Sequence, residues 1–224
     1  MLTVAGLLVA AAVQAALPLA PDPAAIGRVI RFDGFVDERG QPFTAAPADA
    51  RPWIVSPIYT RCPTTCSAIT AGLKAAVEQS GLRPAEYRVL SFSFDPEETD
   101  ASLAAFRARM QLPPDWITLR AGDPAALEST LRRLDFRTVR LDGGVLEHPN
   151  VIAILAPDRR LVAYLPGVAV PAAELTGAVA RARAAPGALD AWRLDLLGVA
   201  ALGFLASSAG FVVLLARRRT STSP

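Results

Sequence analysis

Short runs of consecutive apolar residues alternate with segments of helical periodicity through the middle of the chain. Apolar runs of about four to eight residues are typical of strands that are covered on both faces. We predict strands at residues 53–59, 87–94, 116–119, 151–155 and 161–165. The turn residues Pro157-Asp158-Arg159-Arg160 separate the last two, which predicts an antiparallel hairpin.

Apolar residues recur at helical spacing between these runs. Within residues 65–79, Ile69, Leu73, Ala76 and Val77 stand at positions i, i+4, i+7 and i+8, which places them on one face of a helix. Similar patterns predict further helices at residues 103–110, 127–134 and 172–183. Strands that alternate with helices favour an α/β fold with parallel pairing, to which the late hairpin adds an antiparallel strand. We therefore expect a mixed sheet flanked by helices.

The N-terminal end of the chain is more apolar than the middle. The run from Met1 to Leu19 is apolar, and Val13 and Ala15 are small residues at the −3 and −1 positions of a cleavage site after Ala15. Residues 1–20 are therefore predicted to be a signal peptide or, if they are not cleaved, an N-terminal anchor.

The C-terminal end is also apolar. From Leu196 to Ala216 the chain has no charged residue, and about 20 apolar residues are enough to span a bilayer as a helix. The arginines at 217–219 follow at once, and positive residues beside a span favour the cytoplasmic side. We therefore predict a linker, a transmembrane helix and a cytoplasmic tail at residues 185–193, 194–216 and 217–224. The main domain, residues 22–184, is then expected on the outer, periplasmic face of a bacterial cytoplasmic membrane.

The charge of the chain argues against one class of partner. The formal net charge is +2, from 23 basic and 21 acidic residues. The basic residues are scattered among the acidic ones and form no block interleaved with aromatic residues. Nucleic-acid binding is therefore not expected.

The candidate chemistry is concentrated in very few side chains. The chain contains 2 cysteines, Cys62 and Cys66, and 1 histidine, His148. Both cysteines lie where the predicted strand 53–59 ends and the predicted helix 65–79 begins, which is the thioredoxin-like arrangement. A thiolate at a helix N-terminus faces the positive end of the helix dipole, so we expect a lowered pKa there. The spacer between the cysteines allows both sulfurs to bind one metal ion at about 2.3 Å, the distance known for zinc, and a disulfide remains possible.

One segment makes the interpretation more specific. Residues 59–66 read Tyr-Thr-Arg-Cys-Pro-Thr-Thr-Cys, which resembles the Sco/SenC family, the thioredoxin-like copper proteins of cytochrome c oxidase assembly. That family also carries an Asp-Pro after a strand and a histidine before a later strand. This chain has Asp95-Pro96 after the predicted strand 87–94, and His148 before the predicted strand 151–155. The resemblance covers about residues 28–183.

The chain departs from the family's pattern at a few positions. A proline commonly follows the second cysteine in the family, whereas this chain has Ser67. The Asp-Thr that usually follows the Asp-Pro segment stands here in reverse order, as Thr99-Asp100. The histidine is flanked by Glu147 and Pro149 in place of Asp and Ser or Thr. All these changes leave the cysteines and the histidine in place.

The resemblance implies that Cys62, Cys66 and His148 bind one copper ion, Cu(I) or Cu(II), with Asp95 near the copper loop as a supporting residue. Thiolates select Cu(I), and imidazole suits copper as well. Glu147 is a candidate to hydrogen-bond the imidazole, although a solvated glutamate is the simpler interpretation. The Arg61 guanidinium is a candidate to stabilise the thiolates, with an exposed loop arginine as the alternative.

The family further implies a metallochaperone that delivers copper to an oxidase subunit, or prepares the copper site of that subunit, during oxidase assembly. The alternative is an enzyme, a membrane-anchored thiol–disulfide oxidoreductase in which Cys62 and Cys66 are the catalytic redox pair that keeps a partner's metal-site cysteines reduced. A structural disulfide between the two cysteines, which export permits, is a further alternative.

Overall fold

Six strands form the central sheet of the structure, a computed structural model in which residues 20–45, 49–63 and 65–185 are described. Their spatial order is β1 (Phe35–Asp37), β4 (Ile117–Ala121), β3 (Arg88–Ser93), β2 (Trp53–Ile58), β7 (Val151–Leu155) and β8 (Leu161–Pro166). The three strands β2, β3 and β4 are parallel, whereas β1, β7 and β8 pair antiparallel with their neighbours. Two short strands, β5 (Val139–Arg140) and β6 (Leu146–Glu147), form a separate ribbon.

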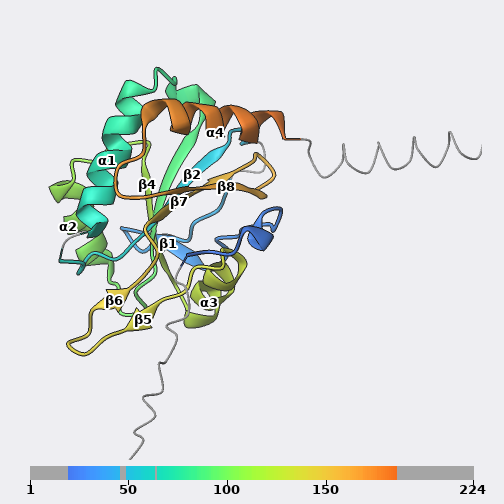
Figure 1. Cartoon of the computed structure of the whole chain (residues 1–224). Coiled ribbons are helices and arrows are strands. Elements are labelled where there is room, and N and C mark those ends of the chain that lie inside the picture. The colour runs from blue at the N-terminus through green and yellow to red at the C-terminus, as the bar shows by residue number, and fades with distance from the viewer. Residues whose placement is uncertain (1–19, 46–48, 64, 186–224) are drawn as a thin grey trace, which may run out of the picture.

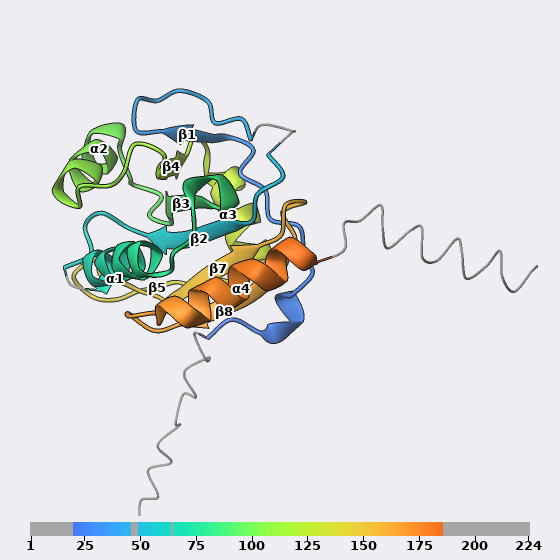
Figure 2. The ribbon, with the colours of Figure 1, turned by 90° about the horizontal axis from the view of Figure 1, so that it is seen from above.

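Helices cover both faces of this sheet. The α-helices of the described residues are α1 (Thr65–Gln79), α2 (Asp100–Arg109), α3 (Pro124–Arg133) and α4 (Ala172–Ala184), and the short 3-10 helices are η1 (Pro23–Ala25) and η2 (Pro84–Glu86). Figure 1 shows α1 and α2 on one side of the sheet and α3 on the other. In the turned view of Figure 2, α4 lies beside α1, and it packs against β7 and β8 as well.

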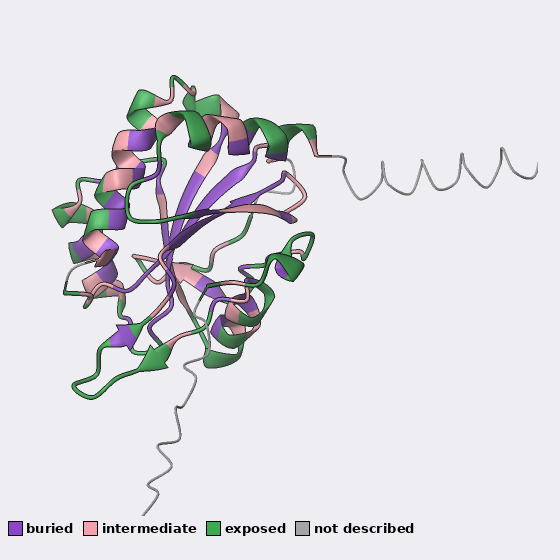
Figure 3. Cartoon of the chain, viewed as in Figure 1, coloured by how far each residue is buried: buried purple, intermediate pink, exposed green. Residues whose placement is uncertain are grey.

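The inner strands are buried along their whole length. Every residue of β2 and of β7 is buried, and so are all residues of β3 except the first. Figure 3 shows these strands as the buried centre, with exposed residues on the outer sides of the helices. Helices on both faces explain why these strands are continuous apolar runs rather than alternating ones.

The pairing of the strands determines where the loops meet. In the parallel pair β2 and β3, Ile58 lies opposite Ser93 at the last shared position. The loops that follow both strands therefore leave the sheet at the same edge. Because β7 runs antiparallel to β2, the chain that enters β7 approaches this edge too.

The predicted mixed sheet flanked by helices is confirmed. The helix predicted at residues 65–79 has these bounds in the structure, and the predicted hairpin appears as β7 and β8. Strands β1, β5 and β6 were not predicted. They contain 3, 2 and 2 residues, which is too short for an apolar alternation to be recognised in the sequence.

The membrane segments stay predictions. Among the described residues, helices long and apolar enough to cross a bilayer are absent. The N-terminal segment up to residue 19 and everything after residue 185 lie outside the described residues. This second part holds the predicted linker from residue 186 on, the predicted transmembrane helix and the predicted tail.

Gly72 lies where α1 packs tightly against the segment between β8 and α4. A Cβ atom added at this position would lie 2.5 Å from the carbonyl oxygen of Val168. Because the obstacle is a backbone atom, a side chain here requires the backbone of one segment to shift. Glycine is therefore needed at this helix position despite its low helix propensity.

A Gly72→Ala substitution is expected to lower the free energy of unfolding. Overpacking of this kind costs about 1–3 kcal/mol, which outweighs the gain of up to about 1 kcal/mol in helix propensity. Gly177→Ala in α4 is the matched control, because its Cβ would meet only the flexible end of Arg181, at 3.5 Å. Urea unfolding of the full chain, followed by tryptophan fluorescence, should show a loss for the first variant and none for the second. A stabilised Gly72→Ala protein would contradict the close approach.

Asp49 holds the starts of β2 and β3 together. Its buried carboxylate, with 4% of the side chain exposed, accepts hydrogen bonds from Arg51 Nε (2.7 Å) and Arg88 Nε (2.9 Å). Burial raises the pKa of Asp49, but the bonds from the two arginines outweigh this and lower the pKa to about 2.

A lowered pKa in the folded state makes the contribution of Asp49 depend on pH. The stabilisation is complete above the ordinary pKa of 3.8 and is lost as the pH falls towards 2. Asp49→Asn should therefore cost about 2 kcal/mol of unfolding free energy at pH 7, and this difference from the wild type should shrink between pH 4 and about pH 2. Urea unfolding of both proteins at several pH values measures this difference in unfolding free energy. A difference that does not change with pH would contradict the lowered pKa of Asp49.

Candidate metal centre

The two cysteines lie at the junction of β2 and α1. After Ile58 the chain turns, with the Cys62 amide donating to the Tyr59 carbonyl (3.2 Å), and α1 begins at Thr65. Cys62 is half-buried in the loop, whereas Cys66 is in the first turn of α1 and is 1% exposed. The sulfurs are not joined by a disulfide. The predicted strand, loop and helix around the cysteines are therefore confirmed.

Backbone amides hold both sulfurs. The Cys66 amide, in the first turn of α1, donates to Cys62 Sγ at 3.4 Å. The Tyr59 amide donates to Cys66 Sγ, also at 3.4 Å. The loop is thus folded so that each sulfur accepts a hydrogen bond from the backbone amide of another residue in the turn.

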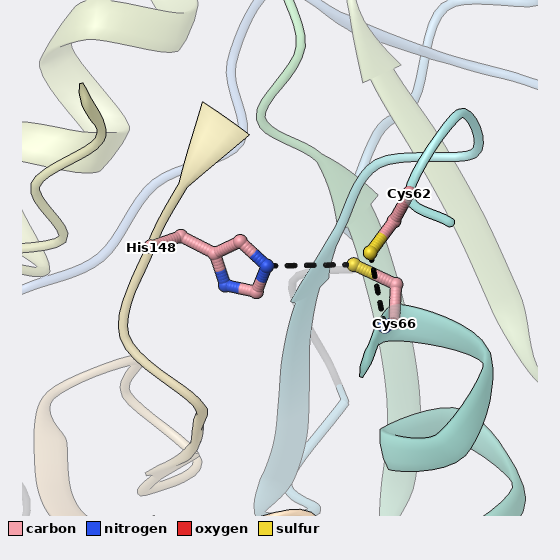
Figure 4. A group of neighbouring side chains, drawn as sticks. All are labelled: Cys62, Cys66 and His148. Atoms are coloured by element: carbon pink, nitrogen blue, oxygen red, sulfur yellow. Dashed lines mark hydrogen bonds between the residues drawn. The ribbon is translucent and has the colours of Figure 1, made fainter. Parts of the chain in front are cut away.

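His148 reaches the sulfurs from a distant part of the sequence. It lies between β6 and β7, and its Nε2 is 3.8 Å from Cys66 Sγ. Figure 4 shows the imidazole directed at the two sulfurs. The ligand atoms of Cys62, Cys66 and His148 all lie within 4.8 Å of one another. Three atoms bound to one ion at about 2.0–2.3 Å, in a trigonal or tetrahedral arrangement, lie about 3.3–4.0 Å apart. The most widely separated of the three atoms therefore need to approach by about 1 Å to share an ion.

The backbone determines which nitrogen of His148 faces the sulfurs with a lone pair. His148 Nδ1 lies 3.1 Å from the carbonyl oxygen of Pro149. Because a carbonyl can only accept, Nδ1 must carry the proton, and Nε2 is left as an acceptor or metal ligand. The role considered for Glu147 is thus filled by a backbone carbonyl, while Glu147 itself is exposed.

Aromatic rings fix the position of the imidazole. The ring centroid of His148 lies 4.8 Å from that of Phe94, 5.8 Å from that of Tyr59 and 6.1 Å from that of Phe136. Tyr59 and Phe94 are buried and contact each other, with ring centroids 5.2 Å apart. The histidine ring is therefore packed among aromatic rings, which restricts its rotation.

The electrostatics of Cys66 differ from the expectation for a helix N-terminus. Burial raises the pKa of the Cys66 thiol well above its ordinary value, although the hydrogen bond from the Tyr59 backbone opposes this. The prediction of a lowered pKa is therefore wrong for Cys66, because burial removes the hydration that a thiolate needs. The amide of the first helical turn is directed instead to Cys62.

Cys62 and His148 are the members of the group that line a solvent-accessible cavity. This cavity has a volume of about 260 Å³ and lies between the β2–α1 loop and the ribbon of β5 and β6. Its walls include Tyr59 and Val145. Cys66 lies behind the two accessible residues, so a ligand or partner that enters the cavity meets Cys62 and His148 first.

The structure places Asp95 beside the cysteine loop, where the hydrogen bonds to its carboxylate come from Arg61 and the Glu97 amide. Its buried carboxylate accepts from Arg61 Nε (3.0 Å) and Arg61 Nη2 (2.6 Å). Arg61 also donates to Glu97 (2.8 Å), so its charge is compensated by carboxylates of the β3–α2 loop. The structure thus connects Asp95 to the loop through the residue that precedes Cys62.

Sequence reasoning missed Glu98. This side chain is 9% exposed and accepts hydrogen bonds from the Thr60 amide (3.0 Å), the Thr60 hydroxyl (2.7 Å) and the Ser93 hydroxyl (2.7 Å). The Ser102 hydroxyl donates to it as well. In the sequence Glu98 is one of several acidic residues after a strand, and nothing local separates it from a solvated turn residue.

Comparison with known proteins places this site in a family. The family model described as SCO1/SenC matches residues 28–183. A candidate electron-transfer protein from Aquifex aeolicus VF5 is similar in structure, with a TM-score of 0.66, 29% identity, and coverage of 71% of this chain and 95% of that chain. No curated protein matches the chain.

Two further solved structures share the thioredoxin-like fold at lower identity. Arabidopsis thaliana ScoI, described with copper bound, has a TM-score of 0.54 and 20% identity, and the match covers 70% of this chain and 97% of that chain. BsSco, described as having a disulfide switch and as a member of the Sco family of cytochrome c oxidase assembly proteins, has a TM-score of 0.60 and 20% identity, with coverage of 74% and 98%. The mixed α/β sheet is therefore of the thioredoxin-like type, and the chain belongs to the SCO1/SenC family.

Proposed function

We propose that this protein binds one copper ion through Cys62, Cys66 and His148 and acts in the assembly of cytochrome c oxidase. The observation that carries the proposal is the convergence of these three ligand atoms, from two separate loops, within 4.8 Å. Thiolates select Cu(I), and a neutral imidazole suits copper in either oxidation state. The donor set thus fits copper better than it fits hard cations such as Mg²⁺, which prefer oxygen ligands.

The family supports the same proposal. A member with this fold, Arabidopsis thaliana ScoI, is described with copper bound, and BsSco is described as a cytochrome c oxidase assembly protein. In this chain the packing of His148 against Tyr59 and Phe94 holds one ligand in place before the ion arrives. A preorganised ligand loses less conformational freedom on binding.

We further propose that copper is cargo, passed to an oxidase subunit by ligand exchange. Cys62 and His148 face the cavity, so the thiolates of a recipient can reach the ion from that side while Cys66 lies behind. The predicted C-terminal helix at residues 194–216 would keep the domain at the periplasmic face of the membrane. Tethering to the membrane that holds the recipient raises the effective concentration of the two partners.

A second candidate function is thiol–disulfide exchange, which the unlinked sulfurs and the unequal exposure of the cysteines favour. The Cys62 thiolate would attack one sulfur of a partner's disulfide, forming a mixed disulfide and releasing the first partner thiolate. Cys66, after giving up its proton, would then attack Cys62 Sγ and release the second thiolate. The partner gains two electrons and two protons, and Cys62 and Cys66 lose the same number as they form a disulfide.

Copper binding is expected to require all three proposed ligands. The full chain, purified under reducing conditions, should bind about one equivalent of Cu(I). Cys62→Ser, Cys66→Ser and His148→Ala should each weaken binding by more than the 10–100-fold that is typical of losing an outer-shell partner. Competition with a Cu(I) chelator measures the affinities, with Glu147→Ala as the control because Glu147 is the exposed neighbour of His148.

The same measurements separate the two candidate functions. A wild-type protein that never retains close to one copper ion would exclude the copper proposal. Copper affinity that is unchanged in His148→Ala, together with loss of disulfide reduction in Cys62→Ser, would favour thiol–disulfide exchange instead.

The two thiols should differ in reactivity. In a Cys66→Ser protein the remaining Cys62 should react with iodoacetamide at pH 7 at least about 10-fold faster than Cys66 does in a Cys62→Ser protein. The reason is that Cys66 is 1% exposed and burial raises the pKa of its thiol. The difference should vanish in 8 M urea, which serves as the control, and equal rates in the folded proteins would contradict the geometry.

A further inference from the structure

We propose that Glu98 is a positioning residue for the cysteine loop: its carboxylate holds Thr60 and thereby determines how Cys62 is presented to Cys66. The inference rests on the proposed function, because it concerns the same pair of sulfurs. Glu98 lies outside the group of three proposed ligands, and the sequence offers no reason to connect it with them.

The contacts of Glu98 join three segments of the chain. The Thr60 amide and hydroxyl come from the β2–α1 loop, the Ser93 hydroxyl from the end of β3, and the Ser102 hydroxyl from the first turn of α2. Both oxygens of the carboxylate are used, Oε2 by the Thr60 amide and Ser93, and Oε1 by the two remaining hydroxyls. A carboxylate is the side chain that can accept this many hydrogen bonds without donating one.

The position of Thr60 explains why this matters for the sulfurs. In the preceding residue, Tyr59, the amide donates a hydrogen bond to Cys66 Sγ at 3.4 Å. The Tyr59 carbonyl accepts one from the Cys62 amide at 3.2 Å. Thr60 thus lies between the residue that contacts both cysteines and Cys62 itself. Because its amide and its hydroxyl are both bonded to Glu98, the backbone at this point has little freedom to rotate. A change at Glu98 is therefore transmitted along the backbone to Cys62.

The ion pairs of Arg61 are a second restraint on the same loop. Arg61 binds Asp95, whose side chain is 1% exposed, and Glu97, whose side chain is 57% exposed. Because the Arg61 side chain is itself 54% exposed, water and salt screen its pair with Glu97, which therefore contributes little. The bonds to Glu98 are protected from water, since Glu98 is 9% exposed. Buried hydrogen bonds to a charged group are the stronger class.

Burying the Glu98 carboxylate would also be an unfavourable way to stabilise the fold if stability were its only role. The hydrogen-bond partners of Glu98 described above are neutral amides and hydroxyls, and a buried carboxylate loses much of its hydration. Asp49, by contrast, is a buried carboxylate paired with Arg51 and Arg88 at the other end of β2. This contrast makes Asp49 a natural control for the general effect of removing a buried carboxylate.

The test measures the equilibrium between the Cys62–Cys66 dithiol and glutathione disulfide in the full chain, without copper. The protein loses two electrons and two protons as its disulfide forms, and glutathione disulfide gains them to give two glutathione molecules. The structure, with its Glu98 contacts, is that of the dithiol form. Glu98→Ala should therefore shift the equilibrium constant towards the protein disulfide by at least about 10-fold, the loss expected for more than one buried hydrogen bond, and Glu98→Gln by less.

Thr60→Val and Ser102→Ala separate positioning from a merely structural role. Each removes one hydroxyl from Glu98, but only Thr60 lies on the cysteine loop. We expect Thr60→Val to shift the constant by at least about threefold, roughly the effect of one buried hydrogen bond, and Ser102→Ala to shift it by clearly less. Thr60→Val has nearly the shape of the original residue, so it is informative even if Glu98→Ala does not fold. Asp49→Ala should lower stability and leave the constant unchanged.

The outcomes distinguish this proposal from the proposed function. Equal equilibrium constants for disulfide formation in the wild type, Glu98→Gln and Thr60→Val would overturn the positioning role. Equal shifts of this constant in Thr60→Val and Ser102→Ala would overturn it as well. Copper binding is measured in parallel on the same proteins. A wild type that binds no copper, with constants that still shift as expected, would overturn the copper proposal and support the role of Glu98.

Discussion

The parallel pairing of β2 with β3 is the constraint on which the rest of this structure depends. The pairing runs from Trp53 opposite Arg88 to Ile58 opposite Ser93, so both strands end at one edge of the sheet. The loop with the cysteines and the loop with Asp95 and Glu98 therefore leave the sheet side by side. The antiparallel pairing of β7 with β2 brings the segment before β7, and with it His148, to the same edge. Cys66 and His148 are 82 positions apart in the sequence. The order of the strands is thus what brings them into one site.

At this edge two opposing requirements are met by different side chains. A thiolate that binds a metal or exchanges with a partner needs access, whereas a defined geometry needs packing. Cys66 and the aromatic rings around His148 are buried, and burial raises the pKa of Cys66 because a thiolate there would be poorly hydrated. Cys62 remains half-buried beside the cavity and receives the amide of the first helical turn. One sulfur is therefore presented to solvent, and the other is held behind it.

The parts of the fold that could be predicted are those with a local signal. The apolar periodicity of residues 65–79 and the turn between β7 and β8 depend only on neighbouring residues, and both appear as expected. The ribbon of β5 and β6 could not be predicted, since strands of 2 residues carry no periodicity. The candidate ligands could be named because the chain has only 2 cysteines and 1 histidine. The partner of the imidazole could not, because it is a backbone carbonyl, that of Pro149, and any residue has one.

The sequence by itself determined the class of the fold, the family and the three candidate ligands, because periodicity, a short cysteine motif and a scarce residue type are all visible along the chain. Only the tertiary structure decided how these residues act on one another. It placed Cys66 behind Cys62, reversed the expected direction of the pKa shift of Cys66, and connected Glu98 to Thr60. Each of these depends on burial and on contacts between distant segments, and both arise only when the strands pair and the helices cover them.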